Sequence, residues 1–194
     1  MNKYFIINTD KKFFYVVLIF YFFFYMDYMK NGGIIYDDWS LATGFLNYNF
    51  LERVNVFVLE FFNTRPIGGI YAAIITGLGK NDLAYIFINS SLWLFSSAFI
   101  YFSLSKLFSI QSSIIFLLVS IFPSFASTPF FSPVTQSLGV FSIFLWSLSI
   151  FFAEKKKIKL TVVFFIMSIL TYETSIVLFL FNIYFLSLNN NLDN

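Results

Sequence analysis

Residues 83–105, LAYIFINSSLWLFSSAFIYFSLS, decide the fold class of this chain. This run is about 23 residues long, and about 20 apolar residues are enough for an α-helix to cross a bilayer. The remainder of the 194 residues has the same character, because the chain is 59% hydrophobic and only 11% charged, against about 25% charge in a typical soluble domain. The sequence therefore predicts an integral membrane protein.

Further apolar runs lie on both sides of this segment. A run at 160–188, about 29 residues long, exceeds one bilayer thickness and is interrupted by Thr171-Tyr172-Glu173-Thr174-Ser175. We expect two short helices that meet at Glu173. The predicted fold is all-α, a polytopic transmembrane bundle of five or six spans in a single membrane domain over residues 1–194. The other expected spans are 13–29, 107–125 and 137–153.

Residues 30–82, between the first and second spans, form an outer loop. Charged side chains alternate in it with apolar ones that recur at helical spacing, namely Phe50, Val54, Phe57, Val58 and Phe61. Such a pattern is typical of an amphipathic helix that lies along a membrane surface, although a helix packed on other helices would show it too. Arg65-Pro66 then opens an apolar segment of about a dozen residues, which is too short to span. Gly68 and Gly69 would let another backbone or a ligand come close to it.

The distribution of lysines sets the sidedness, since cytoplasmic loops are rich in Lys and Arg. No small-residue cleavage site follows the first span, so we expect it to stay uncleaved, with the N-terminus inside and the chain in the cytoplasmic membrane. If residues 66–79 do not cross, the interior holds Lys3, Lys11, Lys12, Lys106, Lys155, Lys156, Lys157 and Lys159. The outer side then holds Asp37, Asp38, Arg53, Arg65, Lys80 and Glu173.

Composition limits the available chemistry. The chain contains neither Cys nor His, which removes thiolate chemistry, the commonest general base and the usual imidazole metal ligands. Carboxylates, Lys, Arg and hydroxyls remain, with room for an oxygen-bound divalent cation such as Mg²⁺ or Mn²⁺. We assign no metal ligand and no other cofactor. The net charge of +2, without a basic patch interleaved with aromatics, predicts no nucleic-acid partner.

Tyr36-Asp37-Asp38-Trp39-Ser40 opens the outer loop. Two acids and a Trp at this place could solvate the loop and anchor a helix end at the lipid boundary, where Trp is enriched. The alternative is a catalytic carboxylate on the outer face, because adjacent acids raise each other's pKa and bring one of them nearer neutrality.

The layout resembles the N-terminal half of the GT-C glycosyltransferases, the polytopic enzymes that use polyprenyl-phosphate sugars, such as protein O-mannosyltransferases and aminoarabinose transferases. The resemblance rests on three motifs, Asp37-Asp38-Trp39, Arg65-Pro66 and Thr171-Tyr172-Glu173-Thr174. It implies transfer of a sugar from a lipid-linked donor to a glycan, lipid or protein acceptor at the outer face. It also implies Asp37 or Asp38 as the base, and Trp39, Arg65, Lys80 and Glu173 as substrate-binding residues.

The chain departs from that family in two ways. The outer loop at 127–136 contains no acid, and members of the family have about a dozen spans, so we expect the chain to correspond to the front half only. The rival interpretation is a non-enzymatic multi-span protein, a transporter or channel fragment or a helix-bundle scaffold. A carrier would be expected to place charges at mid-membrane, whereas most charges here are predicted to lie at one surface.

Overall fold

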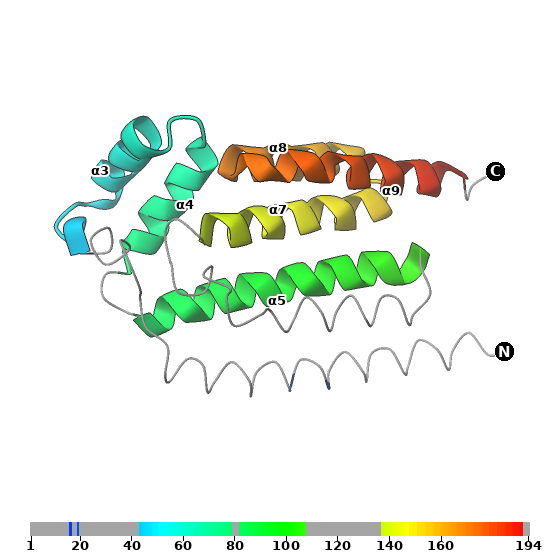
Figure 1. Cartoon of the computed structure of the whole chain (residues 1–194), viewed down its shortest axis with the longest axis horizontal. Helices are drawn as coiled ribbons and strands as arrows, with labels where there is room; N and C mark the ends of the chain where they lie inside the picture. Colours follow the sequence, from blue (N-terminus) through cyan, green and yellow to red (C-terminus); the bar gives the residue numbers. More distant parts are fainter. Residues whose placement is uncertain (1–15, 17–18, 20–42, 79–81, 108–136, 192–194) are drawn as a thin grey trace. The chain divides into compact units, whose positions relative to one another are not determined.

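The computed structural model describes residues 16, 19, 43–78, 82–107 and 137–191, and every regular element in these ranges is helical (Figure 1). The chain divides into two compact units, Met1–Gly33 and Ile34–Asn194. In the first unit, Val16 and Ile19 are helical and exposed. The rest of the span expected at 13–29, and nearly all of that expected at 107–125, lie outside the described residues.

The second unit contains all the elements whose bounds are described. They are α3 (Phe50–Asn55), the π-helix η1 (Val56–Phe61), α4 (Pro66–Thr76), α5 (Asp82–Leu107), α7 (Ser137–Glu154), α8 (Ile158–Thr171), the 3₁₀-helix η3 (Glu173–Leu178) and α9 (Phe179–Asn191). In Figure 1, α7 lies beside α5 and α8. The α7 helix contacts α5, α8 and α9 directly.

Two of the described helices are long and apolar enough to cross a membrane. They are the parts Phe87–Ser105 of α5 and Ser137–Glu154 of α7, which match the spans predicted at 83–105 and 137–153. The other apolar helices in the described ranges are shorter. The expectation of two short helices that meet at Glu173 is confirmed, because α8 ends at Thr171 and η3 begins at Glu173.

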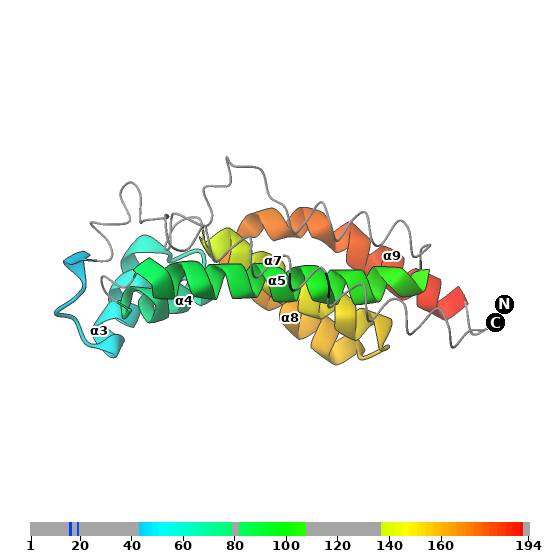
Figure 2. The same ribbon diagram turned by 90° about the horizontal axis from the view of Figure 1, so that it is seen from below.

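A lysine-rich turn joins α7 to α8. Lys156 adopts the left-handed conformation, with φ 58°, and the N–H groups of Lys156 and Lys157 donate to the carbonyls of Ala153 and Phe152. These bonds satisfy the last carbonyls of α7 and end the helix. The turn therefore reverses the chain, so that α8 returns alongside α7 (Figure 2).

Small polar side chains hold α7 against its neighbours. Ser142 donates to the carbonyl of Ser168 (3.0 Å), Ser168 donates back to the carbonyl of Ser142 (2.9 Å), and Ser142 also bonds to Ser175. Buried hydroxyls of this kind let helices approach closely and form hydrogen bonds between them. The seam thus ties α7 to α8 and to η3.

A second polar contact lies further along α7. Trp146 Nε1 donates to Asn182 Oδ1 (3.0 Å), and Asn182 Nδ2 donates to Ser149 Oγ (2.8 Å). Asn182 is buried, and these bonds satisfy its amide at both ends. Because Ser175 meets Ser142 and Asn182 meets Trp146, η3 and α9 run in the same direction as α7.

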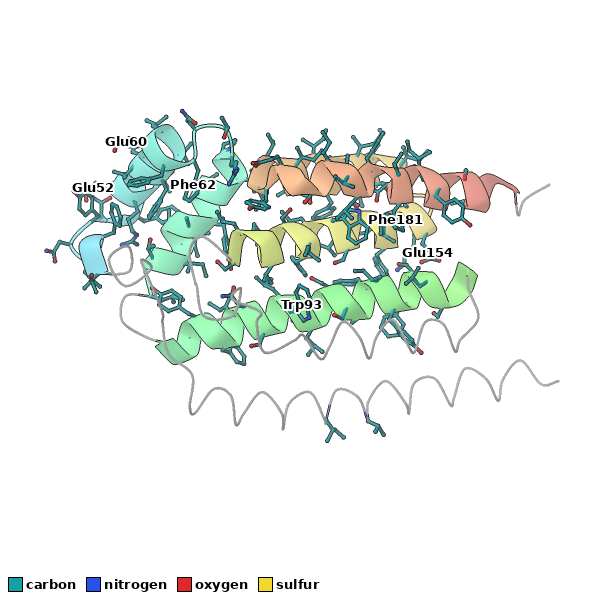
Figure 3. The ribbon with its side chains drawn as sticks, in the orientation of Figure 1. Glu52, Glu60, Phe62, Trp93, Glu154 and Phe181 are labelled. Atoms are coloured by element: carbon teal, nitrogen blue, oxygen red, sulfur yellow. The ribbon has the colours of Figure 1, made fainter. Side chains whose placement is uncertain are left out.

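The helical segment at 50–61 packs on α4. This agrees with the second interpretation of its sequence pattern, a helix packed on other helices. Val54, Phe57 and Val58 are wholly or partly buried, but Phe50 and Phe61, predicted on the same face, are 47% and 55% exposed. The π-helical turn accounts for Phe61, because its i→i+5 bonding gives Phe57 and Phe62 the same direction. Phe62 N–H donates to the Phe57 carbonyl (2.7 Å), the two rings stack, and Phe62 lies between η1 and α4 (Figure 3).

Candidate functional site

An ion pair joins two of the residues that the sequence singles out. Arg65 precedes α4 and Glu173 opens η3, 108 positions later in the chain, and Arg65 Nη2 donates to Glu173 Oε1. The two side chains are 27% and 59% exposed. The pair therefore lies at the surface, within reach of solvent or of a ligand.

Tyr172 completes this group from the extended residue between α8 and η3. Its ring lies under the guanidinium of Arg65, with 4.7 Å from Arg65 Cζ to the ring centroid. A cation over an aromatic face is held in place electrostatically. Tyr172 also packs against the buried cluster that includes Tyr71 and Leu138. The ring thus links Arg65 to the core of the bundle.

Two glycines let α4 approach closely enough to form this contact. A Cβ on Gly68 would lie 2.7 Å from the carbonyl oxygen of Thr171, the last residue of α8. A Cβ on Gly69 would lie 2.9 Å from Val58 Cγ2 and 3.0 Å from Val58 Cα. Protein atoms therefore lie close beside both glycines, as expected if the glycines let another segment of the chain approach. Without a side chain at 68 the start of α4 can lie against the end of α8, and without one at 69 it can lie against η1.

The hydrogen bonding of Arg65 is incomplete. A guanidinium carries five N–H donors in a planar fork, and one bond from Arg65 to a side chain is present. Its Nε is buried and has no acceptor. Nε and Nη2 form one edge of the fork, the edge that pairs with two oxygens of a carboxylate or phosphate. Glu173 occupies only the Nη2 half of that edge.

The pKa of Glu173 lies below its ordinary value. The principal cause is a hydrogen bond from its own backbone N–H, followed by the hydrogen bond from Arg65. Both favour the charged carboxylate. Glu173 is therefore an anion at neutral pH, and the pair is a true ion pair.

A polar contact lies in the core beneath α4. Tyr71 OH donates to Asn89 Oδ1 of α5 (3.2 Å), and Tyr71 also bonds to the side chain of Ser137. Burial raises the pKa of Tyr71 to about 12, so the phenol stays neutral. These bonds fix α4 to α5 and α7.

The site lies at one end of the bundle. Gly68 faces Leu138, near the start of α7, and Thr171, at the end of α8. The other end of α7 carries the lysine-rich turn, and Glu154 marks it in Figure 3. The charges of Arg65 and Glu173 are thus separated from the lysine cluster by the length of α7, which is about 27 Å at 1.5 Å per residue.

Four of the other predicted site residues, Asp37, Asp38, Trp39 and Lys80, lie outside the described residues. Arg53, expected on the same side, donates to the backbone carbonyls of Tyr48 (2.6 Å) and Ala73 (3.1 Å), so it ties α3 to α4. Within the described ranges, no three Asp or Glu residues come close enough to hold a metal ion.

Tyr172 is the functional candidate that sequence reasoning missed. It stands beside Glu173 in the interrupted stretch 171–175, and an aromatic residue next to an acid at a helix break was the available indication. Comparison with protein-family models, curated proteins and solved structures finds no match for this chain. The interpretation of the site therefore rests on its geometry and chemistry.

Proposed function

We propose that this chain is a membrane glycosyltransferase-like protein that transfers a sugar from a polyprenyl-phosphate donor at the outer face of the cytoplasmic membrane. The observation that carries the proposal is the surface position of Arg65. Its guanidinium lies over the ring of Tyr172, and of the two donors on its Nε–Nη2 edge only Nη2 has an acceptor. A planar fork of this kind suits a phosphate group. Arg65 also precedes the start of α4, where first-turn N–H groups add positive potential.

In this proposal the two charges of the transfer reaction are handled by different residues. Arg65 neutralises the phosphate of the donor, which leaves as the new glycosidic bond forms. Asp37 or Asp38 removes the proton from the acceptor hydroxyl, and the acceptor oxygen attacks the anomeric carbon. Trp39 and Lys80 contribute to substrate binding, Glu173 is the carboxylate beside the phosphate-binding edge of Arg65, and a divalent cation is compatible with the chemistry.

The burial pattern supports this reading over a carrier. Among the side chains whose burial is described, which exclude Asp82 and Lys106, the buried polar ones are Ser, Thr, Asn and Tyr, and none is charged. Carriers and pumps are expected to place ionisable groups within the membrane. In the described part of the chain, the partly exposed ion pair of Arg65 and Glu173 lies at one end of the bundle. A lipid-linked substrate would present its phosphate at such an end.

The proposal is tested by transfer from radiolabelled polyprenyl-phosphate sugars in membranes that contain the full chain. We expect Asp37→Asn or Asp38→Asn to reduce transfer by about 10²–10⁴-fold, the usual contribution of a general base. Asp193→Asn, the same change in the C-terminal tail, is the matched control and should leave transfer unchanged. Transfer by both loop variants at the wild-type rate, or no transfer above a vector control by the wild type, would overturn the proposal.

A further inference from the structure

The carboxylate of Glu173 occupies a position that a phosphate oxygen could take. Its Oε1 accepts from Arg65 Nη2, while the adjacent Nε of the same edge is buried without an acceptor. A buried N–H without a hydrogen-bond partner is destabilising. A phosphate offers several oxygens and can satisfy both nitrogens at once, which Glu173 does not do in this arrangement.

The bond to Glu173 is also easily exchanged. Its side chain is 59% exposed, and exposed ion pairs contribute only about 0.2–1 kcal/mol. Arg65 itself lies over the ring of Tyr172, which packs against the buried cluster of Tyr71 and Leu138. When the carboxylate leaves, the guanidinium therefore keeps its place.

We propose that Glu173 is a built-in competitor, an anion that fills half of the phosphate-binding edge of Arg65 and is displaced when a phosphate binds there. The identity of the ligand as a lipid-borne phosphate rests on the proposed function, whereas the competition rests on the contacts of Arg65. The Glu173 carboxylate thus lowers the affinity of Arg65 for phosphate, and it keeps the arginine paired when no substrate is bound.

Binding of a short prenyl phosphate tests the competition without any transfer reaction. The full chain is placed in nanodiscs of neutral lipid and titrated with farnesyl phosphate. We expect Glu173→Gln to tighten binding by about two- to five-fold, the equivalent of an exposed ion pair, and Arg65→Gln to abolish it. Glu60→Gln, which makes the same charge change at an exposed position on η1, is the control and should leave the affinity unchanged.

The outcomes separate the two proposals. Equal or weaker binding by Glu173→Gln, with wild-type binding that depends on Arg65, overturns the competition and leaves a phosphate site at Arg65 in place. Equal tightening of farnesyl phosphate binding by Glu60→Gln overturns the competition as well, because the loss of one negative charge anywhere on the protein would then explain the higher affinity. No binding by any form overturns both the competition and the phosphate role of Arg65.

The source of the phosphate is read from parallel titrations. Inorganic phosphate, and nanodiscs that contain phosphatidylglycerol, replace farnesyl phosphate against the same variants. A Glu173→Gln effect on any of these probes supports the competition, and the probe that shows it identifies a prenyl phosphate, a free phosphate or a lipid headgroup as the ligand.

Discussion

At the scale of single residues, the ion pair shows what a sequence pattern can and cannot provide. The lysine bias predicts that Arg65 and Glu173 share one side of the membrane, and in the structure the two side chains form an ion pair. No local pattern could pair them, because 108 positions separate the two in sequence and the contact depends on how α4 lies against α8. The role of Tyr172 depends on the same packing.

The lowered pKa of Glu173 predicts a pH dependence of stability. A carboxyl whose pKa is lower in the folded state stabilises the fold at neutral pH, and this contribution is lost as the pH falls through the folded pKa. We expect Glu173→Gln to cost less than about 1 kcal/mol at pH 7, since the pair is exposed, and to cost nothing well below the ordinary Glu pKa of 4.5. Thermal unfolding in detergent measures both, with Glu60→Gln as the control. An equal loss in acid and at neutrality would contradict the prediction.

At the scale of helices, the ends of the spans follow from the apolar runs, but the internal irregularities do not. The segment 137–153 was predicted almost as observed, because a polar or charged residue bounds it at each end. The π-turn at Val56–Phe61 was missed, since nothing in an apolar repeat reports a change from i→i+4 to i→i+5 bonding. As a result, Phe62 is partly buried against Phe57, Ala72 and Ala73, whereas Phe61, which was predicted on the apolar face, is exposed.

Two glycines of α4 give a prediction about helix packing. Gly69→Ala would place a methyl group within 3.0 Å of Val58 backbone, and Gly68→Ala would place one 2.7 Å from a carbonyl oxygen. We expect each to destabilise the protein by about 1–3 kcal/mol through overpacking, seen as a lower thermal midpoint in detergent. Gly139→Ala in α7 meets nothing within 4 Å and should be neutral or stabilising by up to about 1 kcal/mol. Equal effects of all three changes would show that α4 does not approach α8 and η1 this closely.

The serine seam gives a second prediction at this scale. Ser142→Ala removes bonds to Ser168 and Ser175 on two neighbouring elements. We expect a loss of about 1–2 kcal/mol, given about 0.6 kcal/mol for an average hydrogen bond between membrane helices. Ser147→Ala is the matched control, because Ser147 is equally buried but bonds to the Phe144 carbonyl within its own helix. The detergent unfolding midpoint should fall for the first variant alone, and a fall of the same size for both would contradict the role of the seam.

At the scale of the whole molecule, the arrangement of the described bundle agrees with the predicted segregation of charge. The α4 helix has 11 residues and is about 16 Å long, which is about half of the hydrocarbon thickness of a bilayer. A helix of this length is too short to span a bilayer by itself, as the predicted sidedness requires. The α7 helix leads from the end that carries Arg65 and Glu173 to the end that carries Lys155, Lys156 and Lys157.

The last two elements extend this argument to the C-terminus. The six residues of η3 and the 13 of α9 measure about 12 Å and about 20 Å at their respective rises of about 2.0 and 1.5 Å per residue. Their sum matches the roughly 30 Å of a bilayer core. Because α9 runs in the same direction as α7, and Leu186 packs in the cluster of Ile150 and Ala153, its end lies near the lysine-rich turn.

Reporter fusions test this topology. We expect a fusion after Lys80 to report the outer side, and fusions after Lys157 and after Asn191 to report the cytoplasm, because lysine-rich loops are retained inside as a rule and the end of α9 lies near this turn. A reporter on the outer side after Lys157 would invert the bundle and remove Arg65 and Glu173 from the proposed active face. A reporter on the outer side after Asn191 alone would show that η3 and α9 do not cross, and it would leave the Arg65 end of the bundle where the proposal requires it.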